Sequence, residues 1–143
     1  MTERKYEKYV TTEPLKKNFK GGISLTTKLL HTDLNCVVGM HCIKRAFMMH
    51  EETHKHDFEQ VLCFIGGDPT NMYEFGAEVE FSLGEEREKY TITKTTIVHL
   101  PAGLYHCPLN FKRIDKPIIF LEVMLTPKYD KVVSGKYPSD KHQ

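Results

Sequence analysis

THKHDFEQVLCFIGG, residues 53–67, sets two histidines one residue apart before an apolar run that ends in paired glycines. Side chains on a β-strand alternate between two faces, so His54, His56, Phe58 and Gln60 share one face. Two imidazoles at this spacing can chelate one cation, and a side-chain amide oxygen can add a harder ligand. Because an isolated HxH pair is more often a polar surface pair, this stretch needs a further ligand elsewhere in the chain to predict a metal site.

PAGLYHCPLN, residues 101–110, supplies that further ligand. Pro101 ends the preceding strand, Gly103 suits a turn with positive φ, and His106 follows at the start of the next segment. A third imidazole delivered from a turn at one end of a barrel could join His54 and His56. Three histidines and one oxygen ligand would leave room for water or substrate.

The rest of the chain predicts an all-β sandwich or barrel. Short runs rich in β-branched, aromatic and aliphatic residues alternate with turn sequences; they are SLTTKLL (24–30), NCVVGMHCI (35–43), AFMM (46–49), QVLCFI (60–65), AEVEFSL (77–83), KYTIT (89–93), TIVHL (96–100) and PIIFLEVML (117–125). We expect a single domain, residues 1–143, whose barrel spans about residues 22–125 and whose polar arms lie at both ends. EPLKKNF in the first arm could form a helical turn or two.

Charge and composition narrow the partners. Lysines and arginines (20) nearly balance aspartates and glutamates (19), so the net charge of +1 gives no reason to expect binding to nucleic acid or an anionic membrane. The charged N-terminal stretch lacks the apolar core of a signal peptide, and no apolar run is long enough to span a bilayer, which predicts a cytoplasmic protein. Four widely spaced cysteines are expected to be reduced thiols, mostly packed in the core.

The two stretches together resemble the cupin family, whose motifs are commonly written G-x5-HxH-x3,4-E-x6-G and G-x5-PxG-x2-H-x3-N. The spacing matches from His54 to Gly67 and from Pro101 to Asn110. The resemblance implies a small jelly-roll β-barrel that holds one divalent transition metal, which could be Mn, Fe, Ni, Co, Cu or Zn. The implied ligands are His54, His56, Gln60 and His106.

The sequence departs from the cupin motifs at three positions. The leading glycines are replaced by Met48 and Thr95, and the acidic ligand is replaced by Gln60, with Glu59 beside it. A neutral glutamine would leave a divalent site with a charge of about +2, which strengthens a Lewis acid and weakens retention of the metal. Strand alternation favours Gln60 as the oxygen ligand, whereas a local bulge would turn Glu59 inward. A cupin barrel that has lost its metal is the alternative.

Three further residues are candidates for proton transfer or substrate binding. His99 shares a strand face with Pro101 and could point into the cavity, although a hydrogen-bonded wall histidine is the plainer interpretation. Glu122 interrupts an apolar strand face; if it is buried, it could act as a general base or acid. Tyr105 could donate a hydrogen bond to a substrate oxygen or serve only in packing. The remaining histidines have no spacing relation to the cluster, although His41 could line a barrel; they are His31, His41, His50 and His142.

These observations lead to two hypotheses of different classes. The first is a metal-dependent enzyme that acts on a small carbonyl, carboxylate or enol metabolite by Lewis-acid-assisted proton transfer, such as isomerisation, elimination or hydrolysis. Within that class, the same histidines could hold iron for a dioxygenase. The second hypothesis is a non-catalytic barrel that binds a small ligand. QVLCFI is apolar on both faces, which predicts a covered exterior, and a homodimer is the expected cover.

Overall fold

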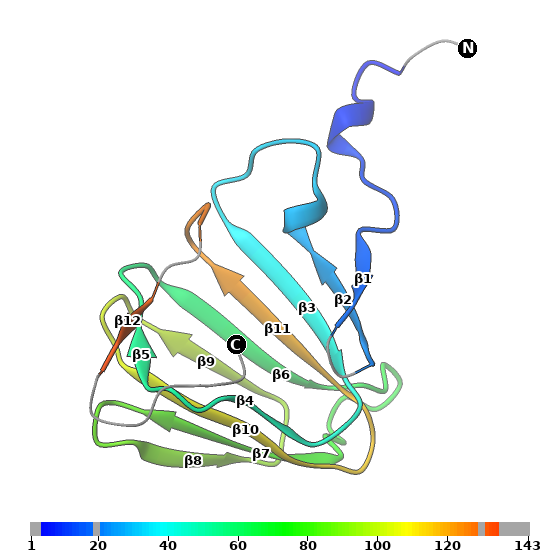
Figure 1. Ribbon diagram of the computed structural model, residues 1–143. Helices are drawn as coiled ribbons and strands as arrows, with labels where there is room; N and C mark the ends of the chain where they lie inside the picture. The colour runs from blue at the N-terminus through cyan, green and yellow to red at the C-terminus, as the bar shows by residue number, and fades with distance from the viewer. Residues whose placement is uncertain (1–3, 19–20, 129–130, 135–143) are drawn as a thin grey trace.

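A computed structural model describes residues 4–18, 21–128 and 131–134 of the chain, and its strands form two antiparallel sheets (Figure 1). The first sheet has the order β1 (Leu15–Lys17), β2 (Ile23–Thr26), β3 (Val37–Ile43), β11 (Ile118–Met124), β6 (Gln60–Gly66) and β9 (Thr96–Leu100). The second has the order β12 (Val132–Val133), β5 (His54–Lys55), β10 (His106–Ile114), β7 (Ala77–Leu83) and β8 (Glu88–Ile92), and β4 (Phe47–His50) also pairs with β10. Two 3-10 turns, η1 (Glu7–Tyr9) and η2 (Thr27–Leu29), precede β3.

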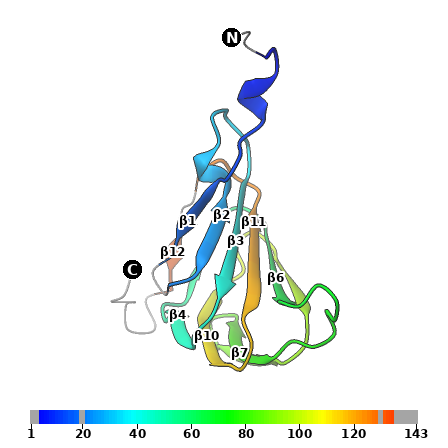
Figure 2. The same cartoon turned by 90° about the vertical axis from the view of Figure 1, so that its right-hand side faces the viewer.

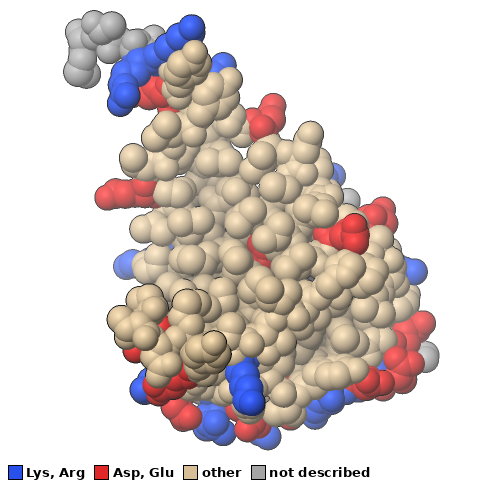
Figure 3. Space-filling model, turned by 180° about the vertical axis from the view of Figure 1, so that it is seen from behind, with Lys and Arg blue, Asp and Glu red and all other residues tan. Residues whose placement is uncertain are grey.

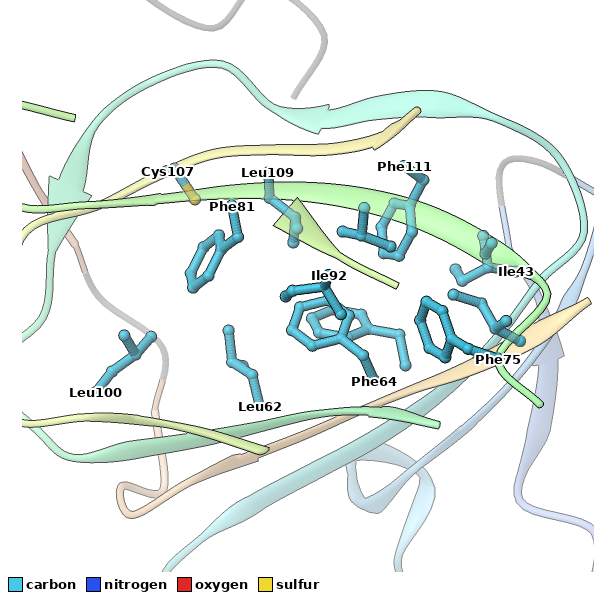
Figure 4. Packing of buried hydrophobic residues seen from close by; sticks show 14 residues of the cluster. Ile43, Leu62, Phe64, Phe75, Phe81, Ile92, Leu100, Cys107, Leu109 and Phe111 are labelled. Atoms are coloured by element: carbon cyan, nitrogen blue, oxygen red, sulfur yellow. The ribbon is translucent and has the colours of Figure 1, made fainter. Parts of the chain in front are cut away.

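The hydrophobic core lies between the two sheets (Figure 4). Inward positions of the strands supply it, as in β7, where Val79 and Phe81 are buried while Glu78 and Glu80 are partly exposed. Side chains of this strand thus alternate between the core and the outer face from Ala77 to Phe81. Burying each large apolar side chain contributes roughly 1.5–3 kcal/mol relative to its exposed state, so the aromatic side chains of the core account for much of the stability. The prediction of an all-β fold is confirmed.

The two arms add short edge strands to this body. β1 pairs with β2, and Figure 2 shows the order β1, β2, β3, β11 and β6 across this sheet. The prediction of a helical turn in EPLKKNF is therefore wrong, because Leu15–Lys17 instead satisfies its backbone groups by pairing with Ile23–Leu25. From the second arm, β12 pairs with β5. Residues 129–130 and 135–143, and with them His142, lie outside the described residues.

Two further predictions concern reduced cysteines and the lack of a membrane-spanning stretch. All four cysteines are free; Cys63 and Cys107 are buried, while Cys36 and Cys42 are partly exposed. Across the described part of the chain, no helix has the length and apolar character needed to cross a membrane.

Candidate metal centre

The predicted ligands converge from both sheets at one end of the core. His54 on β5 lies directly opposite His106 on β10, and His56 follows β5. Gln60 begins β6 in the other sheet. All four side chains are buried, with exposed fractions of 2–5%. Polar side chains at such depth need partners, so their clustering marks a site rather than a surface patch.

A β-bulge places His106 on the inner face. Along β10, His106 and Leu109 are three residues apart, whereas their partners on β7, Leu83 and Phe81, are two residues apart. In a regular strand, positions three apart would point to opposite faces, so the extra residue turns both side chains inward. The same irregularity buries Cys107 beside His106.

The three imidazoles are close together, and backbone carbonyls orient two of them, His54 and His106. Ring centroids are 4.5 Å apart for His54 and His106, 5.0 Å for His54 and His56, and 5.2 Å for His56 and His106. Nδ1 of His54 lies 2.8 Å from the carbonyl oxygen of Glu52, and Nδ1 of His106 lies 3.0 Å from that of Leu104. A carbonyl only accepts, so each Nδ1–H donates, which leaves Nε2 as a lone-pair ligand.

Gln60 adds an oxygen to this cluster. Its Oε1 is buried and has no hydrogen-bond partner in the structure. An unsatisfied buried amide oxygen costs free energy unless something binds it, and a cation ligated by imidazoles is such a partner. Glu59 points the other way: its side chain is 53% exposed and its carboxylate lies 2.8 Å from His99 Nε2. The structure therefore places Gln60, not Glu59, beside the histidines.

The surroundings of His54 and His106 keep these two side chains neutral. Burial and the neighbouring His106 lower the pKa of His54 from 6.5 to about 3. Burial likewise lowers the pKa of His106 from 6.5 to about 4, although its hydrogen bond to Leu104 opposes this effect. Neutral imidazole is the form that binds metal ions, so both side chains are ready to bind a cation at neutral pH.

A cavity of about 30 Å³ lies among these side chains. Its lining also includes two residues to which the sequence analysis gave no ligand role, His50 and Cys107. Ligand atoms of His54, His106 and Cys107 lie within 4.8 Å of one another, which makes the thiol a possible ligand too. Pro108 is the sequence signal for this position, because a proline cannot donate to a strand ladder and favours a bulge.

The structure does not bring His99 or Tyr105 to the cavity. His99 lies opposite Val61 and is 59% exposed, so its side chain does not point into this cavity; it lines a separate groove between β8 and β9 instead. It shares a face with Pro101, as predicted, but that face is the outer one, because Leu100 between them is buried. Tyr105 precedes His106 and faces outward, where Lys55 Nζ lies 5.0 Å from its ring centroid. Neither side chain lines the cavity.

Glu122 does line the cavity. It lies on β11 opposite Leu62 of β6 and Gly39 of β3, and its side chain is 20% exposed. One carboxylate oxygen lies 3.4 Å from Nε2 of His41. A carboxylate thus faces the space beside the predicted ligands.

Backbone contacts hold the two motifs together. Gly103 has a φ of +87° and donates its N–H to the carbonyl oxygen of His56 at 2.7 Å. The predicted positive-φ turn is confirmed, and it fixes the position of His56 relative to the segment that leads to His106. Thr53 donates its hydroxyl to the carbonyl oxygen of Cys107 at 3.0 Å and so anchors the bulge.

Neither a family model nor a curated protein matches this sequence. Among solved structures, an uncharacterized conserved protein with a double-stranded beta-helix domain from Klebsiella pneumoniae subsp. pneumoniae is 15% identical, with 95% of this chain and 99% of that chain covered and a TM-score of 0.56. This chain has the double-stranded β-helix fold. It is the fold of the cupins, so the resemblance drawn from the two motifs is confirmed at the level of the fold.

Other proteins with similarity to this double-stranded β-helix include enzymes. Oxalate decarboxylase from Lactobacillus farciminis is 17% identical, with 84% of this chain and 33% of that chain covered and a TM-score of 0.49. DMSP lyase DddQ from Ruegeria pomeroyi is 15% identical, with 87% of this chain and 59% of that chain covered and a TM-score of 0.49. At these values the likeness concerns the fold alone.

Proposed function

We propose that this protein is a metal-dependent enzyme that catalyses proton transfer on a small oxygenated metabolite. His54, His56, His106 and Gln60 would hold one divalent transition metal. The convergence of three buried imidazoles, of which His54 and His106 direct Nδ1 to backbone carbonyls and so present Nε2, beside an amide oxygen without a hydrogen-bond partner, is the observation that carries the proposal. The donor set of imidazole and amide oxygen suits several first-row metals, and the cupin-like fold supports the same interpretation.

The chemistry would combine a Lewis acid with a base. A bound divalent metal supplies polarisation of a carbonyl or carboxylate oxygen. Glu122 lines the cavity as a carboxylate and can accept a proton from the carbon next to that carbonyl. The C–H electron pair then stays in the substrate as an enolate, and Glu122 returns the proton to a different atom or position. Isomerisation follows this scheme. In an elimination the electron pair of the enolate instead expels a leaving group from the neighbouring carbon, and Glu122 gives the proton to that group.

The space around the site supports a small substrate. The cavity of about 30 Å³ has room for an ion or a water molecule but not for an organic molecule. A groove of about 560 Å³ shares Phe81 with this cavity and runs between β8 and β9. Apolar side chains such as Leu83 and Val98 line it together with polar ones such as Thr91 and Lys94. The body of a metabolite would lie in this groove, with its oxygenated end toward the histidines.

The first test is metal analysis of protein purified without a chelator or an affinity histidine tag. We expect near-stoichiometric metal in the wild type and loss of that metal in His106→Ala. The matched control is His31→Ala, because His31 is exposed and lies outside the cluster. A folded wild-type protein that stays empty when divalent cations are supplied would contradict the metal site.

The second test separates an enzyme from a ligand-binding barrel. The metal-loaded protein is incubated in D2O with a panel of 2-oxo acids, beginning with pyruvate and 2-oxobutyrate, and exchange of carbon-bound hydrogen is followed by NMR. We expect deuterium incorporation that is lost in Glu122→Gln. Ligand binding by a chelator-treated protein, without exchange on any member of the panel, would favour a non-catalytic binding protein instead.

A further inference from the structure

A line of polar side chains runs from the N-terminal strands to the cavity. Ser24 on β2 lies opposite His41 on β3, and its Oγ is 2.7 Å from His41 Nδ1. Nε2 of the same ring lies 3.4 Å from a carboxylate oxygen of Glu122 on β11. Three adjacent strands of one sheet thus align these side chains across the sheet, and only Glu122 lines the cavity.

The hydrogen atoms along this line can be placed from the donors and acceptors present. The backbone N–H of Gly22 donates to Asn18 Oδ1 at 2.9 Å, which identifies Nδ2 as the amide donor. That Nδ2 donates to Ser24 Oγ at 3.3 Å, so the serine hydroxyl can direct its own hydrogen to His41 Nδ1. His41 then carries its hydrogen on Nε2, on the side of Glu122.

The opposite direction, in which His41 Nδ1 donates to Ser24 Oγ, leaves the serine hydroxyl hydrogen without an acceptor. If His41 Nδ1 carried the hydrogen, Ser24 Oγ would accept from both His41 and Asn18, and its hydroxyl hydrogen would need another acceptor. Ser24 is 1% exposed, so water does not reach it. A buried donor without an acceptor is costly, which favours the direction from Asn18 through Ser24 to His41.

The backbone makes room for the contact between His41 and Glu122. Gly39 lies directly opposite Glu122 in the sheet. A Cβ atom at position 39 would lie 3.2 Å from His41 Nε2 and 3.4 Å from Glu122 Cγ. The glycine therefore leaves the space in which the imidazole and the carboxylate approach each other.

Hydrolases also use a serine, a histidine and an acidic residue in a line of contacts, but the geometry here assigns the roles differently. A nucleophilic serine needs access to substrate. Ser24 is buried and does not line the cavity, whereas Glu122 does. Ser24 consequently orients His41, and the Glu122 carboxylate is the group that can reach a substrate.

We propose that Ser24 and His41 are positioning residues that hold the Glu122 carboxylate toward the cavity as a proton acceptor. This inference rests on the proposed proton-transfer function. A hydrogen on His41 Nε2, which lies 3.4 Å from the carboxylate oxygen, restricts the carboxylate in orientation and so holds it where it can accept a proton from carbon. Neither Ser24 nor His41 would touch the substrate.

The hydrogen-bond direction is tested first, by nitrogen-15 NMR of the His41 side chain in the full-length protein. We expect the Nε2–H tautomer in the wild type and a loss of this single tautomer in Ser24→Ala. A wild-type spectrum with hydrogen on Nδ1 would overturn the proposal, whatever the protein's activity.

The second readout is the deuterium exchange described above, measured as kcat and KM on the panel member that exchanges. We expect Ser24→Ala and His41→Gln to lower kcat on the order of 10- to 100-fold with little change in KM, because a displaced base affects the chemical step more than binding. Ser24→Thr keeps the hydroxyl and should restore most of kcat. Ser82→Ala, which removes another buried serine hydroxyl, and His31→Gln should leave kcat unchanged.

The outcomes separate the two proposals. Wild-type exchange that Ser24→Ala and His41→Gln leave unchanged, in variants that melt at the wild-type temperature, overturns the positioning role alone. Absence of exchange in the wild type counts against the proposed function, and the His41 tautomer then decides whether the line is oriented as described.

Discussion

Acidification should destabilise the metal-free protein through two buried histidines. The pKa of His54 is lowered to about 3 and that of His106 to about 4, against 6.5 for an unperturbed imidazole. Below about pH 6.5 these two imidazoles therefore bind protons in the unfolded chain but stay neutral in the folded chain. The free energy of unfolding consequently falls as the pH falls. The loss begins near the unfolded value of 6.5 and continues until the pH reaches the folded values.

The size of this effect follows from the same values. Between about pH 7.5 and about pH 5.5, each imidazole should cost about 1.4 kcal/mol, and the two together about 2.7 kcal/mol. The assay is urea unfolding of chelator-treated protein, followed by circular dichroism at both pH values. The change in the free energy of unfolding between the two pH values is compared with that of the double variant His54→Asn, His106→Asn, which retains the other titrating groups.

The difference between the two proteins isolates the histidines. The wild type should lose about 2.7 kcal/mol more than the double variant over this range, and each single variant should remove about half of that excess. If the wild type and the variants showed the same pH dependence, the reasoning from burial would be refuted.

Three further predictions concern the ligands, the turn and the exterior. Gln60→Glu adds an anionic ligand and should tighten divalent metal binding on the order of tenfold, measured by competition with a chromophoric chelator; unchanged affinity would contradict a ligand role for residue 60. Gly103→Ala must adopt a φ of +87° and should destabilise the protein by about 1 kcal/mol in urea unfolding, whereas a neutral effect would contradict the turn assignment. Figure 3 shows one face of the molecule, which has few charged side chains at its centre. Separately, the outward residues Ile119, Leu121 and Val123 of β11 are apolar and partly exposed. We therefore expect a homodimer at micromolar concentration in sedimentation, which Leu121→Glu should weaken; a wild-type monomer would contradict it.

Much of the fold and part of the site could be predicted from the sequence because strand alternation is a local property. Alternation along a single strand predicts Gln60 on the face of His54 and His56. In the structure the chain instead leaves β5 after Lys55 and enters β6 of the other sheet at Gln60, and these three side chains are buried while Glu59 is exposed. The spacing of PAGLYHC also predicted the turn at Gly103.

Alternation does not say which face of a strand is inside, and for that reason the sequence leaves the direction of His99 open. It shares a face with Pro101, but the buried neighbour of both is Leu100. Cys107 was assigned no ligand role for a different reason: a bulge interrupts the alternation there and buries two consecutive side chains. The line from Ser24 to Glu122 depends on the order of β2, β3 and β11 in the sheet, which local periodicity does not contain.

The position of Glu122 gives a physical reason for a glutamine at position 60. In the pairing of β6 with β11, Gln60 lies opposite Met124 and Leu62 lies opposite Glu122, so Gln60 and Glu122 are diagonal neighbours on the inner face. Diagonal neighbours of this kind are about 7–8 Å apart. A carboxylate at position 60 would be occupied in ligating a cation and would reduce the site's positive charge. A carboxylate at position 122 instead stays available to accept a proton, while the neutral amide leaves the cation's charge to act on the substrate. On this argument the double exchange Gln60→Glu, Glu122→Gln should bind metal more tightly than the wild type and yet lose deuterium exchange, which separates the role of ligand from the role of base.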